Sequence, residues 1–580
     1  SINTIYRSLI QEVEVPLQDG MSEASLEKFA DKELQLEPGQ HGQSTMQGEV
    51  RTPLLLLLGV TGLVLLIACA NIANLLLARA TNRAGEIAIR LSVGAQRRQI
   101  VAQLLAESFL LAAAGGLLGI LVAQGALKAV LSLLPPEASS GLDVRLGTAV
   151  WLFMSALTLV TGLVGLFPAL HATRADLAST LKSQPGKASS SKGATRFRQA
   201  MVTFQIAMSM ALLISAGLFT RSLVNATRVD LGVDVDQLAT FGVSPELNGY
   251  TPSECKTFFG RLESELEAVP GVTSVAASMV PMIAGSNWMN NVTVQGFASE
   301  PDADTVSSFN MVGPGYFRTA GIPLIAGREF ETRDDLEAPK VAIVNEAFAR
   351  KFELGREAVG KYMRQGRSDD GELDIEIVGL VADANYSDVK QEVPPVYFRP
   401  YLQSEDLGAI NFYVRASREP EQLLPALRET VARLDPNLPI EELRTMTMQV
   451  EEMLVLARVR SRLSGAFALL ATILAAVGLY GVVAYAVAQR RREIGLRMAL
   501  GADGGRVSRM VLGSVAWTAV PGALIGVAVA LGLGRVASSL LFEIEAHDPA
   551  VYVVAVLLLL TITFGAGLVP ARRAASIDPM

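Results

Sequence analysis

Residues 85–95 read GEIAIRLSVGA, and residues 492–502 read REIGLRMALGA. The two segments align without a gap at a separation of 407 residues, and Glu, Ile, Arg, Gly and Ala recur in register. Each segment follows one long apolar run and precedes another. A repeat at this distance is far too long for a solenoid, so the sequence indicates a duplicated membrane module.

Each copy of the segment predicts a short amphipathic helix. The acid precedes the base by four residues, an order that stabilises a helix. A glycine four residues after the arginine supplies a helix stop. One copy alone would be explained equally well by a solvated basic loop helix, but two copies at equivalent places favour a docking surface for a partner. The candidate site residues are Glu86, Ile87, Arg90 and Gly94 in the first copy and Glu493, Ile494, Arg497 and Gly501 in the second.

The composition indicates a membrane protein. Half of the 580 residues are hydrophobic, 18 % are charged, and the mean hydropathy is +0.35, which is too apolar for ordinary soluble domains. The net charge of −7 argues against nucleic acid as a partner. Cys69 lies in an apolar run and Cys255 in a polar region, so no disulfide framework is expected. The three histidines lack ligand spacing, and Ser, Cys and His do not cluster, so we expect neither a metal site nor a catalytic site.

Seven apolar runs are long enough to cross a bilayer, which takes about 20 residues in a helix. Lys and Arg in the short loops mark the inner side of a membrane and place the carboxyl terminus there too. The acidic block 222–457 then lies outside. The predicted spans lie near 54–78, 104–124, 149–170, 201–220, 463–488, 511–534 and 551–569.

The duplication also predicts the domain organisation. The odd span count puts Ser1 outside, and the first module lacks the opening span that the second module has, so we expect an N-terminally truncated chain. The expected parts are the tail of a first outer domain at 1–50, a three-span module at 51–178, an inner linker at 179–200, a single span at 201–221, an outer domain at 222–457 and a second three-span module at 458–580.

The outer block alternates strand-like and helix-like runs, which is typical of an α+β domain in two lobes. Thr251-Pro252-Ser253-Glu254 has the pattern of a helix start. A helix over about 445–457 is expected to continue unbroken into the span at 463, giving a rigid link. The expected strands are 238–243, 272–278, 292–295, 341–344, 375–381, 396–398 and 411–414, and the expected helices are 253–269, 345–352 and 419–434.

A near match to a phosphate-binding loop, GREAVGKY at 355–362, lacks the Ser or Thr that would hold Mg²⁺ and follows a helix rather than a strand. We interpret it as a tight turn, so the chain is expected to carry no ATPase of its own. Few ionisable residues fall within the spans, which argues against a proton-driven carrier.

The doubled Glu-Ile-x-x-Arg-x-x-x-Gly-Ala segment resembles the FtsX-like and MacB-like permeases of mechanotransmitting ABC transporters. GPGYF at 313–317, GIPL at 321–324 and VNEAFA at 344–349 are similar to the MacB-like periplasmic core domain. The layout resembles the duplicated orphan permeases of acidobacterial type. The resemblance implies an α-helical multi-pass protein of the bacterial inner membrane, with about seven spans in two FtsX-like modules and a large α+β domain, residues 222–457, in the periplasm.

The same resemblance implies a mechanism and partners. The two segments would be coupling helices for cytoplasmic ABC ATPase subunits, which would bind the ATP and Mg²⁺ that this chain does not bind. ATP-driven motion would move the periplasmic domains and extrude a substrate, with a periplasmic or outer-membrane protein as a further partner. The alternative is a signal transducer that transports nothing and activates a periplasmic partner such as a cell-wall hydrolase. A third option is an orphan receptor-like protein without an ATPase.

Overall fold

The computed structural model forms two compact units. The sheet unit comprises Ser1–Gly42 and Arg228–Leu454, and the helical unit comprises Gln43–Thr227 and Val455–Met580. Each unit is described by itself. The structure describes residues 2–17, 22–34, 55, 57–69, 71–72, 89–90, 93–131, 147–164, 192–297, 302–366, 372–389, 392–489, 491–500, 503–538, 541–542 and 544–576.

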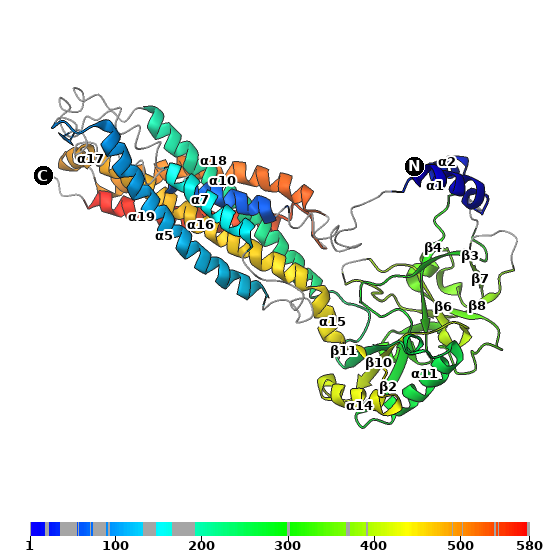
Figure 1. Ribbon diagram of the computed structural model, residues 1–580. Helices are drawn as coiled ribbons and strands as arrows, with labels where there is room; N and C mark the ends of the chain where they lie inside the picture. Colours follow the sequence, from blue (N-terminus) through cyan, green and yellow to red (C-terminus); the bar gives the residue numbers. More distant parts are fainter. Residues whose placement is uncertain are drawn as a thin grey trace. The chain divides into compact units, whose positions relative to one another are not determined.

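Long apolar helices build the helical unit (Figure 1). Their mean hydropathy and length make five of the described helices candidate membrane spans, and two shorter apolar helices, Leu57–Cys69 and Val150–Leu159, lie in the first module. Helices long and apolar enough to cross a membrane are therefore present, while the count of seven spans stays a prediction. The helices are α5 (Arg97–Leu131), α7 (Thr148–Val164), α10 (Lys192–Ala226), α16 (Val455–Gln489), α17 (Arg491–Ala499), α18 (Gly504–Val536) and α19 (Pro549–Ala575).

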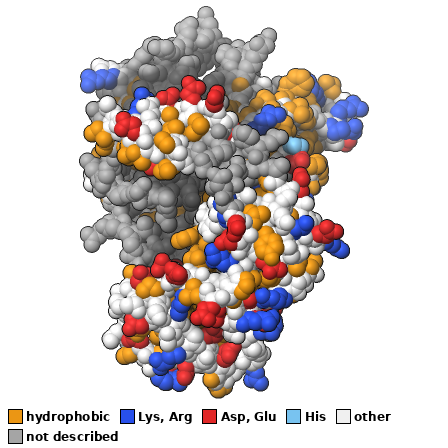
Figure 2. Space-filling view, turned by 90° about the vertical axis from the view of Figure 1, so that its right-hand side faces the viewer, with side chains coloured by type: hydrophobic (Ala, Val, Ile, Leu, Met, Phe, Trp, Pro, Cys, Tyr) orange, Lys and Arg blue, Asp and Glu red, His pale blue; other side chains and the backbone are white. Residues whose placement is uncertain are grey.

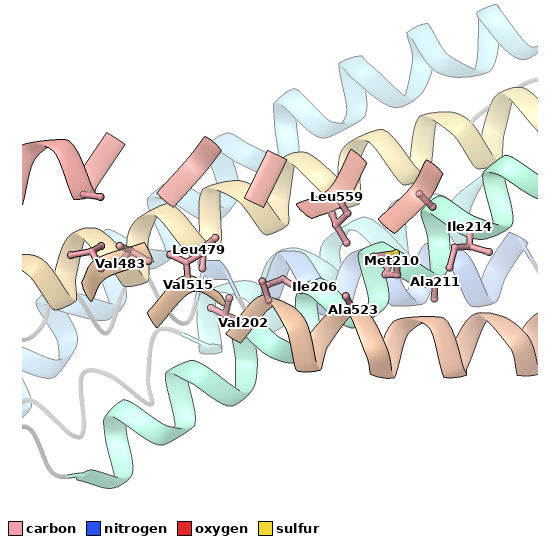
Figure 3. Close-up of a cluster of buried hydrophobic side chains, with 14 of the residues drawn as sticks. Val202, Ile206, Met210, Ala211, Ile214, Leu479, Val483, Val515, Ala523 and Leu559 are labelled. Atoms are coloured by element: carbon pink, nitrogen blue, oxygen red, sulfur yellow. The ribbon is translucent and has the colours of Figure 1, made fainter. Parts of the chain in front are cut away.

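Helices α10, α16, α18 and α19 surround one apolar core. Figure 3 shows side chains from all four helices meeting there. Small residues let the backbones approach closely, because a Cβ added to Gly526 of α18 would lie 2.5 Å from the Ala207 carbonyl oxygen of α10. In the first module, α5 packs along α7. The four-helix core includes Val202, Ile206, Met210, Leu479, Val483, Val515, Ala523 and Leu559.

Helix α10 begins at Lys192, within the predicted linker. The prediction placed residues 179–200 in a linker, but 192–200 continue the span as helix. The stretch 194–200, ATRFRQA, contains no Pro or Gly and several residues of good helix propensity, so nothing in it ends the helix.

One sheet runs through the sheet unit, in the strand order β11-β1-β10-β2-β4-β3-β7-β8-β6-β9, with β5 paired to β8. A parallel pairing of β9 with β4 closes β4, β3, β7, β8, β6 and β9 into a ring. The strands are β1 (Leu238–Val243), β2 (Val272–Ser278), β3 (Met289–Val294), β4 (Val306–Val312), β5 (Leu324–Gly327), β6 (Val341–Asn345), β7 (Tyr362–Gln365), β8 (Ile375–Val381), β9 (Val396–Pro400), β10 (Ile410–Ala416) and β11 (Glu441–Thr445).

Two separate cores correspond to these two parts of the sheet. One lies between β1, β2 and β10 and the helices α11 (Pro252–Glu267) and α14 (Leu424–Leu434), with Phe241, Phe259 and Phe412 at its centre. The other fills the ring of strands, where Phe348 and Tyr397 are fully buried. The expected α+β domain is therefore present, with two cores on one continuous sheet.

Most predicted elements of this unit are confirmed. The predicted bounds of β1, β2 and β8 match those in the structure. Helix α11 opens with a capping box, in which Thr251 and Glu254 satisfy each other's backbone N–H groups. Near 355–362 the chain forms a short 3₁₀ turn, Gly355–Glu357, and Gly360 has a φ of 85°, so the tight-turn interpretation holds.

The predicted continuous helix from 445 into the membrane is wrong. Helix α15 (Met446–Met453) ends, Leu454 forms a turn with ψ −4°, and α16 begins at Val455. The Leu454 N–H donates to the carbonyls of Val450 and Glu451, so these hydrogen bonds end α15 at this residue. Leucine does not break helices by its own propensity, which is why the sequence pattern did not show the interruption.

Four helical pieces complete the sheet unit near its amino end. They are α1 (Ile2–Leu9), the π-helical turn η1 (Ile10–Glu14), η2 (Val15–Leu17) and α2 (Glu23–Ala30). The Ser22 N–H donates to the Asp302 carboxylate over 3.0 Å, which ties the start of α2 to the loop before β4.

Candidate functional site

The second copy of the repeated segment forms helix α17. The Glu493 carboxylate pairs with the Arg497 guanidinium over 2.6 Å, the i,i+4 pair that the sequence spacing predicts. Both side chains are about half exposed. Ile494, one residue after the acid, is 1 % exposed and belongs to the four-helix core. The helix is therefore anchored in the four-helix core by Ile494 and keeps a half-exposed ion pair beside it.

Two leucines of α17 add exposed apolar surface to the helix. Leu496 is 65 % exposed and Leu500 is 80 % exposed. Helix α17 lies at the same end of the helical unit as the carboxyl end of α19 (Figure 1). Arg572 and Arg573 lie in the last turn of α19. The exposed part of the helix is therefore partly charged and partly apolar, and basic residues lie at the same end of the unit.

In the first copy the structure describes Arg90 and Gly94, while Glu86 and Ile87 lie outside the described residues. Gly501 of the second copy also lies outside them. Gly94 has a φ of 100°, and the Ala95 N–H bonds the Arg90 carbonyl over 3.0 Å. This is the Schellman arrangement that ends a helix at a left-handed glycine. The predicted helix stop is thus confirmed for the first copy.

The two arginines make equivalent contacts with the next helix of their module. Arg90 donates from Nη1 to the Gln103 Oε1 over 3.0 Å on α5, and Arg497 donates from Nη1 to the Met510 sulfur over 3.1 Å on α18. Gln103 and Met510 are themselves 407 residues apart. Each segment is therefore hydrogen-bonded to the helix that follows it.

The sequence pattern did not predict these arginine contacts. The signal was available, because both arginines precede their partner by 13 residues and both partners align in the repeat. Glutamine and methionine are dissimilar acceptors, however, and the methionine sulfur accepts only weakly, so the pair did not stand out as a motif.

Among the described residues, no group of three His, Cys, Asp or Glu side chains could hold a metal ion. Both cysteines are free.

Comparison with known families gives matches for the helical modules and for the sheet domain. Residues 58–177 and 465–579 both match the FtsX-like permease C-terminal family, and residues 200–444 match the MacB-like periplasmic core domain. The chain carries FtsX-like permease and MacB-like periplasmic core domains. The two FtsX-like matches fall within the two predicted modules, and their first residues, 58 and 465, are 407 residues apart.

Curated relatives of this FtsX-like and MacB-like chain are transporters. A macrolide export ATP-binding/permease protein, MacB 2, of Aeromonas hydrophila is 26 % identical over 47 % of this chain and 43 % of its own length. The pyoverdine export ATP-binding/permease protein PvdT of Pseudomonas aeruginosa is 25 % identical over 44 % of this chain and 39 % of its own length. An uncharacterised ABC transporter permease, YknZ, of Bacillus subtilis is 21 % identical over 48 % of this chain and 70 % of its own length.

The chain thus spans less than half of the length of the first two relatives. Among solved structures, the periplasmic region of MacB from Actinobacillus actinomycetemcomitans matches 39 % of this chain and 95 % of that structure at 13 % identity and a TM-score of 0.26. The family matches and the apolar helices together show a chain with FtsX-like permease modules, a MacB-like periplasmic core domain and helices long and apolar enough to cross a membrane.

Proposed function

We propose that the chain is the permease subunit of an exporter in which separate cytoplasmic ATPase subunits hydrolyse ATP and the chain converts that work into motion of its periplasmic domain. One observation carries the proposal. Helix α17 is anchored in the transmembrane core by Ile494 while it exposes Glu493, Leu496 and Arg497. A partner that pushes on such a helix moves the core to which the helix is attached.

The hydrogen bond to the following helix supports the same role in both modules. Arg90 contacts α5 and Arg497 contacts α18 at equivalent positions, so each module has its own connection from the exposed segment to a long apolar helix. The proposed coupling residues are those of the two segments, including Glu86, Ile87 and Gly501, which lie outside the described residues. ATP and Mg²⁺ belong to the ATPase partner, the segments face the cytoplasm, and the carboxyl terminus is cytoplasmic.

Export of a substrate is the second part of the proposal. The relatives named above as export proteins support it over the signal-transducer alternative, because their names describe transport. The MacB-like domain would be the part that moves against the substrate in the periplasm, with a periplasmic or outer-membrane protein as the receiving partner.

The decisive experiment exchanges the two charges on α17. The double variant Glu493→Arg with Arg497→Glu keeps an i,i+4 ion pair within the helix, so the helix itself is preserved, but it reverses the charge pattern offered to a partner. We expect ABC ATPase subunits, measured as ATP hydrolysis that co-purifies with the full chain, to be lost from the preparation.

A matched control makes the same exchange where no coupling is expected. Glu331 and Arg333 form an exposed ion pair of 2.8 Å in the sheet unit. Glu331→Arg with Arg333→Glu is expected to retain the ATPase. Equal recovery of ATPase with both double variants would refute docking at α17.

A further inference from the structure

Three helices from both modules meet inside the helical unit. The helix of the first module that contains residues 57–69 and 71–72 packs against α10 and α16, with Ile67, Ala207 and Ala471 in the shared apolar contact. This contact joins the first module to the second.

Three buried polar side chains lie within this apolar contact and tie the helices together. Asn71 donates from Nδ2 to the Leu474 carbonyl of α16 over 2.7 Å. Gln205 of α10 donates from Nε2 to the Ile67 carbonyl over 3.5 Å, and the Ser209 hydroxyl donates to the Ala471 carbonyl over 2.9 Å. Asn71 is 5 % exposed, and Gln205 and Ser209 are 0 % exposed.

The two amide oxygens of this group are unsatisfied. Asn71 Oδ1 and Gln205 Oε1 have no hydrogen-bond partner among the described residues, although both are buried. A buried acceptor without a donor is unfavourable, because water can no longer reach it. Two such acceptors close together can share one donor.

Both oxygens face the same glycine. A Cβ built on Gly478 of α16 would lie 2.2 Å from Asn71 Oδ1 and 2.6 Å from Gln205 Oε1. The two distances sum to 4.8 Å, so the oxygens are at most 4.8 Å apart. A water molecule that donates one hydrogen bond of about 2.8 Å to each of two acceptors spans roughly 4.6 Å at the tetrahedral angle.

We propose that Asn71 Oδ1 and Gln205 Oε1 bind one buried water molecule beside Gly478, and that this water joins the first module to α10 and α16 of the second. A water molecule supplies the two donors that the site requires and accepts further bonds without adding charge. A cation fits poorly, because two neutral oxygens do not offset the cost of removing an ion from water within a membrane span.

Gly478 makes room for the site. A Cβ at this position would clash with both oxygens. Gly465 lies on the same helix, and a Cβ added there meets nothing within 4 Å. Gly478→Ala and Gly465→Ala are therefore matched variants, of which the first displaces the water and the second does not.

The test is a high-resolution cryo-EM map of the full chain in lipid nanodiscs, for the native protein and the Gly465→Ala variant. We expect a density peak within about 3.2 Å of both oxygens in each map. A map in which the Gln205 amide nitrogen donates directly to Asn71 Oδ1, with no peak between them, overturns the proposal.

A thermal double-variant cycle tests the coupling without a map. Asn71→Leu, Gln205→Leu and their combination are compared by the melting temperature of the full chain. Each change removes one anchor of the shared water as well as that side chain's own bond to a neighbouring helix, so the double variant is expected to lose less than the sum of the two single losses. Additive shifts would show that the two side chains act independently, and that result also overturns the proposal. These variants keep the test informative if Gly478→Ala does not fold.

Discussion

The sheet unit and the helical unit are packed in opposite ways. The sheet unit buries large rings, including Phe241, Phe259, Tyr397 and Phe412, each at most 1 % exposed. Along α18 the buried positions are instead mostly small, as at Ala519, Gly522, Ala523, Gly526 and Ala530. In water, burial of large apolar surface drives folding, whereas helices in lipid gain stability from close contact of their backbones.

The repeated modules show when small residues are needed. Gly522 and Gly526 of α18 face α10 at distances that exclude a Cβ. Their counterparts on α5, Gly115 and Gly119, have room, since a Cβ on Gly115 meets nothing within 4 Å and one on Gly119 meets only the end of the Met154 side chain at 3.4 Å. Among the described residues, a close contact with a neighbouring helix is seen at Gly522 and Gly526 but not at Gly115 and Gly119.

The substitution with the largest expected loss of stability lies in the sheet unit. Phe412 stacks on Phe241 with ring centroids 5.6 Å apart and meets Phe259 edge-on at 6.4 Å. Phe412→Ala is expected to cost about 3–5 kcal/mol of the free energy of unfolding. Differential scanning calorimetry of the full chain measures it. Phe204→Ala on α10, where the ring is 40 % exposed, is the control, and a loss as large there would break the contrast between the units.

A smaller effect separates the two modules. Gly526→Ala places a Cβ 2.5 Å from the Ala207 carbonyl oxygen, which belongs to backbone and yields little. We expect a loss of about 1–3 kcal/mol from overpacking. Gly119→Ala, at the equivalent position of α5, is expected to be neutral or to gain up to about 1 kcal/mol from helix propensity. Unfolding in mixed detergent micelles measures both, and equal losses would contradict the comparison.

In the sheet unit, burial and the neighbouring charge of Glu267 raise the pKa of Glu263 to about 7, against a weak hydrogen bond from Tyr401. Because the folded-state pKa is raised, the proton on Glu263 stabilises the fold at low pH, and this contribution is lost as the pH rises through about 7. Glu263→Gln should therefore match the native protein near pH 5 and melt higher above pH 7. Melting curves across this range test it; a constant difference at all pH values would argue against titration of Glu263.

The smallest effect on stability is expected at the exposed ion pair of α17. Arg497→Ala removes an i,i+4 pair that is worth about 0.2–0.5 kcal/mol. The melting temperature of the helical unit should hardly change. If the proposed function is right, the amount of ATPase that co-purifies should decrease. A large drop in melting temperature would mean that the contact with Met510 is mainly structural.

Sequence patterns predicted the parts whose signal is local. The apolar β-branched runs of β1, β2 and β8 matched to the residue, and the Glu493–Arg497 pair followed from spacing. Strands β7, with the sequence YMRQ, and β11, with EELRT, were missed because their composition is polar and their side chains are largely exposed.

The other features that the sequence did not predict depend on tertiary contacts. Strand β4 buries Ser307, Ser308 and Asn310, which read as loop residues until their hydrogen-bond partners are known. The three-helix junction at Gly478 joins residues that no local pattern connects. Periodicity predicts which face of an element is buried, but it does not predict the neighbour that covers it.

The glycine contacts of α18 also set how this protein tolerates genetic change. Every single-base missense change in a glycine codon adds a side chain, so at Gly522 and Gly526 each such change creates a clash with α10. The aromatic core of the sheet unit can exchange one large apolar residue for another at modest cost. Mutational load should therefore fall most heavily on a few small residues in the membrane, even though they contribute little volume to the fold.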